Sequence, residues 1–375
     1  MLKRFCIVRQ QYGLSEDDEN TFWNRSFSPG EFAFLDACRG ASGMMACELP
    51  EQRGLNSWLA VDPTQDVNLG NPNALLFAVP IAVKNDLYGV ILIEEAAGGL
   101  RFRSRRLEII TGIAQQAALA IQNDLLQKEM VVRERLETEV QLARQIQQTF
   151  IPETLPQFEE WELAARWKTA RQVGGDFYDV FDLPGKRLGL FIADVADKGV
   201  PAALFMALTR TLVRAAVTEL ETPAMAMERV NDLLMPDTRQ GMFVTGVYAV
   251  LDMERNELTY VNAGHNPPLW VKHDGNIERL TRTAIALGVV TGEPVNQRTI
   301  KFESGDNLLL YTDGLTESFN AEGEFYGEGR LLESIKSDTC TSASDLLDVV
   351  EKSLLNFVQD MPAADDLTML VLRRL

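Results

Sequence analysis

Four acidic sites in the second half of the chain share one placement: each stands at the end of a short apolar or glycine-rich segment, where a rigid element meets solvent. They are Asp176 in VGGDFYD, Asp194 in IADVADKG, Asp313 in LLLYTDG, and the pair Asp365 and Asp366 in ADDLTMLVL. Two carboxylates that converge to 4 Å repel each other by roughly 4 kcal/mol at an effective dielectric of 20. A divalent cation removes this cost, and ligands that are all oxygen select hard cations such as Mg²⁺ or Mn²⁺.

Metal-assisted hydrolysis of a phosphate ester is the chemistry that such a cluster predicts. Two cations about 3.5–4 Å apart can share one carboxylate and one water molecule, and they lower the pKa of that water so that it can attack phosphorus. Any one of these aspartates, taken alone, is more often a turn or cap residue. The prediction therefore rests on the order of the motifs GGDxxD, ADVxxKG, TDG and DDxT between residues 174 and 368.

Other kinds of site have less support in the sequence. GGD also occurs in the GGDEF signature of diguanylate cyclases, but Phe177 and Tyr178 stand where that family needs an acidic residue and then Phe. The only histidines are His265 and His273, which excludes most zinc sites and most His-dependent triads. His265 lies in NAGHNPPLW, between two apolar runs, and we interpret it as a structural residue of a turn.

The charge balance and the lengths of the apolar runs limit the partners and the cell compartment that we expect. The chain has 36 basic and 54 acidic residues, a formal net charge of −18, which argues against nucleic acid as a partner. The longest apolar run, 74–83, is too short to span a bilayer, and no secretory signal follows Met1. The cysteines form no CxxC pair. We therefore expect a cytoplasmic protein without membrane insertion.

Alternating apolar patterns beyond residue 157 predict a mixed domain that would position the acidic sites. The expected strands cover Trp161–Trp167, Leu188–Ala193, Phe243–Leu251, Leu258–Val261, Leu308–Tyr311 and Leu367–Leu372. The expected helices cover Pro201–Leu220, Met225–Leu234 and Ser342–Phe357. Because hairpin-like neighbours alternate with inserted helices, we expect a layered α+β fold rather than a regular βαβ sheet.

A long helix is expected from about Ser104 to Phe150, where proline is absent and good helix formers dominate. Apolar residues fill six of eight positions of a 3–4 alternating seam: Leu125, Val132, Leu136, Ala143, Ile146 and Phe150. Such a seam is typical of a two-stranded coiled coil, which predicts a homodimer through this helix. A helix packed on its own domain is the alternative. Pro152 and Pro156 would end the helix.

In their order, the acidic motifs resemble those of the metal-dependent PPM (type 2C) protein serine/threonine phosphatases, in the bacterial sporulation and stress-response (SpoIIE-like) branch. QLARQIQQTFIP, FVTGVYAVLD, NAGHNPP and YGEGRL match as well, so the resemblance covers essentially all of 145–375. It implies a C-terminal α-β-β-α sandwich, in which two sheets pack face to face between helices. Two Mn²⁺ or Mg²⁺ ions would lie at one end of this sandwich.

The resemblance also implies roles for individual residues. Asp194 would bridge the two ions and be essential for catalysis. The other implied metal ligands are Asp176 and the backbone carbonyl of Val195 for one ion, and Asp313 and Asp365 for the second; Asp366 would support these ligands or bind through a water molecule. Asp179 would be structural. Two departures from the branch are Ala196 and Asp197, where Ser-Gly is usual, and the lack of an arginine squarely at the phosphate-binding position, for which Arg171 is the nearest candidate.

Residues 79–126 resemble the closing half of a GAF sensor domain, in which a hairpin runs into a long departing helix. The hairpin would be Leu75–Val83 and Leu87–Glu94, joined by three residues. We therefore expect three parts: an α/β GAF-like sensor domain at 1–122 with an unknown ligand, a linker helix at 123–152 and the phosphatase domain at 153–375. The helix would transmit the state of the sensor to the catalytic domain.

By the same resemblance, the substrate would be a phosphoserine or phosphothreonine on a STAS-type anti-sigma factor antagonist. A catalytically silent pseudophosphatase or scaffold is the main alternative, because a fold does not by itself imply chemistry. Loss of one of the acidic sites would favour that alternative, but all four are present.

Overall fold

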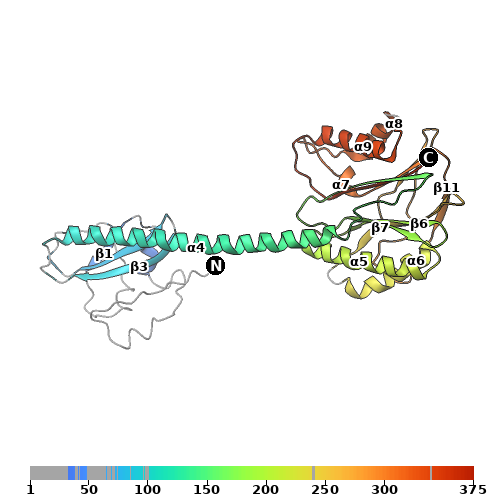
Figure 1. Cartoon of the computed structure of the whole chain (residues 1–375). Helices are drawn as coiled ribbons and strands as arrows, with labels where there is room; N and C mark the ends of the chain where they lie inside the picture. Colours follow the sequence, from blue (N-terminus) through green and yellow to red (C-terminus); the bar gives the residue numbers. More distant parts are fainter. Residues whose placement is uncertain are drawn as a thin grey trace. The chain divides into compact units, whose positions relative to one another are not determined.

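The structure is a computed structural model that describes residues 33–38, 43–48, 75–84, 86–95, 101–238, 241–337 and 340–375, with a few single positions between them. It divides into two compact units, Met1–Arg135 and Leu136–Leu375. The division falls within the helix α4 (Arg103–Gln148), which has 46 residues and confirms the long helix expected from the sequence (Figure 1). The domain boundaries expected at residues 122 and 152 stay predictions.

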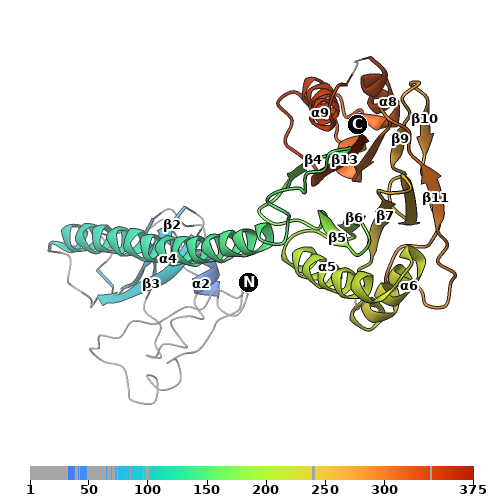
Figure 2. The ribbon, with the colours of Figure 1, turned by 45° about the vertical axis from the view of Figure 1, so that its right-hand side comes forward.

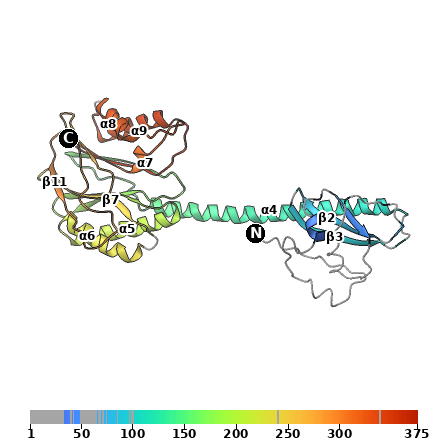
Figure 3. The same cartoon turned by 180° about the vertical axis from the view of Figure 1, so that it is seen from behind.

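The first unit contains an antiparallel sheet in the order β1-β2-β3. Its described elements are α2 (Ala33–Cys38), β1 (Met45–Glu48), β2 (Leu75–Val83) and β3 (Asp86–Glu95). The pairing of β2 with β3 confirms the expected hairpin. Because side chains alternate along a strand, Phe77 packs with Leu107 of α4, whereas Leu76 packs with Cys38 on the other side of the sheet. The first part of α4 runs along this sheet (Figure 3). The resemblance of this unit to a GAF domain stays a prediction.

The second unit is a sandwich of two five-stranded sheets, and it confirms the expected α-β-β-α architecture. One sheet has the order β10-β9-β12-β13-β4 and the other β11-β8-β7-β6-β5. The strands are β4 (Trp161–Lys168), β5 (Phe177–Leu183), β6 (Arg187–Val195), β7 (Val244–Asp252), β8 (Glu257–Ala263), β9 (Leu269–Val271), β10 (Ile277–Arg279), β11 (Arg298–Lys301), β12 (Asn307–Tyr311) and β13 (Leu367–Arg374). All pairings within these two sheets are antiparallel.

Helices cover the outer face of each sheet (Figure 2). Helices α5 (Val200–Glu219) and α6 (Pro223–Leu234) pack on the sheet that contains β6 and β7, and α8 (Gly327–Ser337) and α9 (Ala343–Val358) pack on the other. The strand β12 is buried on both faces: Leu308 and Leu310 point into the core between the sheets, and Leu309 and Tyr311 point toward α8 and α9. Double burial explains why this strand is apolar throughout rather than alternating with polar residues.

The expected strands and helices of this unit are all present, with ends that differ by at most two residues. The sequence did not reveal β5, the short strands β9 to β11, the four-residue helix α7 (Asp313–Thr316) or α8. Helix α5 is the one described helix that is long and apolar enough to cross a membrane by length and composition. Its buried side chains, among them Phe205, Met206 and Val213, belong to the core of the sandwich.

Candidate metal centre

The fold brings the four acidic sites to one end of the sandwich. Asp194 lies at the end of β6 and Asp176 directly before β5, and these strands pair with Phe177 opposite Ala193. In the other sheet, Asp313 follows β12 and Asp366 precedes β13, and these strands pair with Tyr311 opposite Met369. Because antiparallel neighbours place the end of one strand beside the start of the next, each sheet delivers its aspartates to a single edge.

Electrostatic contacts join the carboxylates of the two sheets. Burial, the charge of Asp313 and the charges of Asp365 and Asp366 raise the pKa of Asp194 to about 7, although a side-chain hydrogen bond with Asp176 opposes the shift. Burial and the charge of Asp194 raise the pKa of Asp176 well above its ordinary value. A carboxyl from one sheet thus responds to carboxyls from the other, so the four sites form one cluster.

Asp313, at the start of α7, also has a raised pKa. Burial, the charge of Asp365 and the charge of Glu317 raise its pKa, and the backbone N–H of Gly314 and the cation of Lys198 oppose the shift. Asp176 is only 2% exposed, and its Oδ2 accepts a hydrogen bond from the hydroxyl of Thr368 (3.0 Å). Repulsion between buried like charges is the condition that a bound cation relieves.

Asp366 anchors the loop that carries Asp176. Its Oδ1 accepts a hydrogen bond from the N–H of Ala170 (2.8 Å) and its Oδ2 one from the N–H of Gly175 (3.0 Å). A Cβ at Gly174 would lie 1.8 Å from Oδ2 of Asp366, and one at Gly314 would lie 1.9 Å from its carbonyl oxygen. Both glycines are therefore needed because Asp366 approaches their backbone closely.

Gln147, in the last turn of α4, holds the same loop from the other side. It is 2% exposed, its side-chain nitrogen donates to the carbonyl of Gly174 (2.6 Å), and its side-chain oxygen accepts from the N–H of Gly174 (3.2 Å). The end of α4 is thus bonded directly to the segment that precedes Asp176. No role for Gln147 was predicted from the sequence, because a glutamine in a helical pattern does not indicate which distant backbone groups it will bind.

Lys198 is the lysine of the ADVxxKG motif, but no role for it was predicted from the sequence. Its Nζ lies 2.7 Å from Oδ2 of Asp365 and also donates to the carbonyl of Ala364 (3.3 Å). The charge of Arg171 acts on Lys198, so the expected phosphate-binding arginine lies beside this lysine. Its position could have indicated a role near the cluster, because Lys198 closely follows the strand that ends with Asp194 and Val195. The extra carboxylate Asp197 accepts a hydrogen bond from the N–H of Lys198 (2.7 Å).

Two further residues have the structural surroundings that the sequence predicted for them. Asp179 is buried and paired with Arg210 and Arg214. His265 is buried, with its Nδ1 2.9 Å from the hydroxyl of Thr245 and its backbone N–H bonded to the side chain of Asn262.

The donor set fits hard divalent cations. Within the described ranges no three His, Cys, Asp or Glu side chains form a ready-made metal cage. Protein donors instead bind several of these carboxylates: Thr368 binds Asp176, Lys198 binds Asp365 and backbone N–H groups bind Asp366. The cluster offers five carboxyl groups, and burial and mutual repulsion raise the pKa of four of them. Oxygen donors alone suit Mg²⁺ or Mn²⁺ rather than softer metals.

Known proteins share this domain. A family model described as stage II sporulation protein E (SpoIIE) matches residues 184–375, just over half of the chain. The phosphoserine phosphatase RsbU of Bacillus subtilis is 30% identical over 244 residues, which are 65% of this chain and 72% of RsbU. Protein IcfG of Synechocystis sp. is 31% identical over 263 residues, but these are only 41% of its length.

A solved structure supports the same comparison. The RsbU and RsbW domains of Rv1364c from Mycobacterium tuberculosis superpose with a TM-score of 0.51 and 29% identity, over 60% of this chain and 63% of that one.

Proposed function

The chain belongs to the stage II sporulation protein E (SpoIIE) family of PP2C-type, metal-dependent serine/threonine phosphatases, and on this premise we propose that it hydrolyses phosphoserine or phosphothreonine on a protein. One observation carries the proposal: aspartates up to 190 positions apart, Asp176 and Asp366 at the extremes, act on one another's charge at one end of the sandwich. A structural role would be served better by carboxylates paired with cations, as Asp179 is.

Each acidic residue has a place in this proposal. Asp194 would be shared by two Mn²⁺ or Mg²⁺ ions, Asp176 and the carbonyl of Val195 would hold one of them, and Asp313 and Asp365 the other. When bound, such ions polarise a phosphoryl oxygen and lower the pKa of water. Asp366 would keep the loop 170–175 in place through its two backbone hydrogen bonds.

Arg171 and Lys198 would bind the phosphate of the substrate. Both are cations beside the cluster, and Lys198 contacts Asp365 directly. An arginine or lysine adjacent to the carboxylates would offset their negative charge and attract a phosphate that the cluster alone would repel. With Asp365 bound to a metal cation, the ammonium group of Lys198 would be free to bind the phosphate instead.

The substrate would be a phosphorylated STAS-type antagonist of an anti-sigma factor, in the cytoplasm, and the first unit would control the reaction as a sensor. RsbU and RsbP of Bacillus subtilis, both phosphoserine phosphatases, are related to this chain, and the Rv1364c structure contains an RsbU domain together with an RsbW domain. The bond from Gln147 to Gly174 gives α4 a direct connection to the loop of Asp176.

A homodimer formed through α4 would provide the conformational switch for this control. Apolar side chains of the expected seam are half exposed in the single chain: Leu125, Val132, Leu136 and Ile146. Pairing two copies would bury them, as in a coiled coil. A strict monomer at micromolar concentration in small-angle scattering would contradict this part of the proposal.

A dephosphorylation assay tests the proposal as a whole. The full-length protein is incubated with candidate phospho-STAS proteins and with p-nitrophenyl phosphate, with Mn²⁺ or with a chelator. We expect Mn²⁺-dependent release of phosphate. No release from any of these substrates with Mn²⁺ present would favour a pseudophosphatase that acts as a scaffold, and production of a cyclic dinucleotide from GTP would favour a cyclase.

A further inference from the structure

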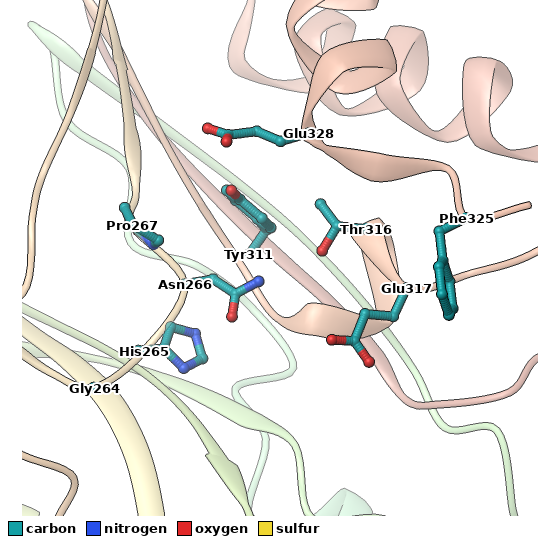
Figure 4. Close-up of a pocket in the computed structure, with 9 residues that line it drawn as sticks. All are labelled: Gly264, His265, Asn266, Pro267, Tyr311, Thr316, Glu317, Phe325 and Glu328. Atoms are coloured by element: carbon teal, nitrogen blue, oxygen red, sulfur yellow. The ribbon is translucent and has the colours of Figure 1, made fainter.

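The second unit contains a cavity of about 550 Å³, whose lining residues are drawn in Figure 4. The residues that line it come from the segment after β8, from β12, from α7 and the residue after it, and from the start of α8 and the segment before it; they are Gly264, His265, Asn266, Pro267, Tyr311, Thr316, Glu317, Phe325 and Glu328. We propose that this cavity binds a basic side chain, lysine or arginine, that lies close in sequence to the phosphorylated residue of the substrate. This inference rests on the proposed phosphatase function and adds a determinant of its specificity.

The position of the cavity relative to the candidate metal centre is fixed by α7. This helix begins with Asp313 and ends with Thr316, which lines the cavity. The N–H of Glu317 donates to the carbonyl of Asp313 (2.7 Å), and the side-chain charge of Glu317 acts on the carboxyl of Asp313. A side chain bound in the cavity would therefore belong to a residue near the one whose phosphate reaches Asp313.

The charge of the cavity selects a cation. Two carboxylates line it, but Glu328 is paired with Arg279 (2.6 Å). Glu317 is exposed, and no lysine or arginine of the described ranges forms an ion pair with it. In Figure 4, Asn266 and Glu317 project toward each other from opposite sides of the cavity. A second phosphate or an acidic side chain would be repelled here, whereas a lysine or arginine would supply the missing partner.

The remaining lining suits the apolar stem of such a side chain. Phe325 is 61% exposed and lines the same cavity as Glu317. Long basic side chains pack their methylene groups on apolar surface while the charged end stays at a polar group, and a cation near an aromatic face is itself favourable. Pro267 adds apolar surface to the lining.

His265 lines the cavity without adding a charge to it. It is only 5% exposed, and a hydrogen bond between its ring and the backbone of Tyr311 opposes the effect of burial on its pKa. Burial nevertheless lowers the pKa of His265 to about 4, so the ring is neutral at pH 7 and does not repel a cation.

A peptide series tests the inference. Phosphoserine peptides are compared in which one position, among the three on each side of the phosphoserine, is Arg, Ala or Glu, and kcat/KM is measured with Mn²⁺. We expect Arg at one position to raise kcat/KM about fivefold over Ala, the size of a favourable exposed ion pair. Glu317→Gln should bring this ratio close to one, and Glu317→Lys should make Glu the preferred residue at the same position.

The ratio between two peptides in one variant removes any general effect of the substitution on the metal centre. Glu322→Gln, an exposed glutamate in the same loop that does not line the cavity, is the matched control and should keep the ratio. Equal hydrolysis of Arg and Ala peptides at every position by the unaltered protein, or a ratio that survives Glu317→Gln, would overturn the inference. Absence of hydrolysis of every peptide would overturn the proposed function and this inference with it.

Discussion

Asp176 and Asp179 are both buried and only three residues apart, but their side chains have opposite electrostatic surroundings. Asp179 is 1% exposed, and both of its oxygens accept hydrogen bonds from Arg214 (2.6 and 2.7 Å), with Arg210 3.1 Å away. Asp176 meets the charges of Asp194 and Asp366 and has hydroxyl groups as its other side-chain contacts. The protein balances the charge of Asp179 with two arginines, whereas no ion pair of the described residues involves Asp176. In the proposed function, a metal cation from solution would balance the charge of Asp176.

Asp194→Ala should give the largest effect. Removal of the shared ligand should lower Mn²⁺-dependent turnover by about a thousandfold or more, because both ions lose a ligand. The variant should nevertheless fold, and without metal it should be at least as stable as the original chain, since one repelling carboxylate is gone. Steady-state kinetics and thermal melts with a chelator measure the two quantities. Unchanged turnover would show that Asp194 is not at the centre.

Asp179→Ala should have the opposite profile. It leaves two arginines without their partner, and because Arg214 is half exposed we expect a loss of about 2–3 kcal/mol in the free energy of unfolding, below the range for fully buried pairs. Turnover per folded molecule should persist. Urea unfolding measures the loss, and Asp182→Ala, at an exposed position of the same strand, is the control that should change stability by less than about 0.5 kcal/mol.

Gln147→Ala tests whether the loop beside Asp176 needs its support from α4. Without the two bonds to Gly174 the loop should be less ordered, and we expect the Mn²⁺ concentration for half-maximal activity to rise about tenfold, as for other residues that orient metal ligands. Gln148→Ala, at the exposed neighbouring position, should leave it unchanged. An equal metal requirement in both variants would contradict a positioning role for Gln147.

Stability without metal should also depend on pH. Asp194 has a pKa of about 7 in the folded protein against 3.8 ordinarily. Between these values the folded state holds more protons than the unfolded state, so stability without metal should fall as pH rises from 4 to 7. We expect the melting temperature to drop over this range, by roughly 2–4 °C for each kcal/mol lost, and Mn²⁺ to reverse the drop. Asp194→Asn should flatten the slope; an equally steep slope in that variant would assign it to other groups.

Local patterns were enough to predict the strands that carry the cluster. Leu188–Ala193 and Leu308–Tyr311 are apolar because they are buried in the sandwich, and the acidic residue that ends each run is visible in one dimension. Strands of three or four residues, such as Leu269–Val271 and Arg298–Lys301, were missed because they are too short to show a period. β5 was missed because its buried Asp179 breaks the apolar pattern.

The sequence by itself determined which residues could bind metal, in which order they occur and at which strand ends they stand, because these features depend on residue type and local periodicity. Tertiary structure alone decided that Lys198 pairs with Asp365, that Gln147 binds Gly174, and that Glu317 lines a cavity in which no described lysine or arginine pairs with it. These residues are brought together when one sheet packs on the other, or when the end of a helix packs against a loop. A local sequence pattern cannot predict such distances.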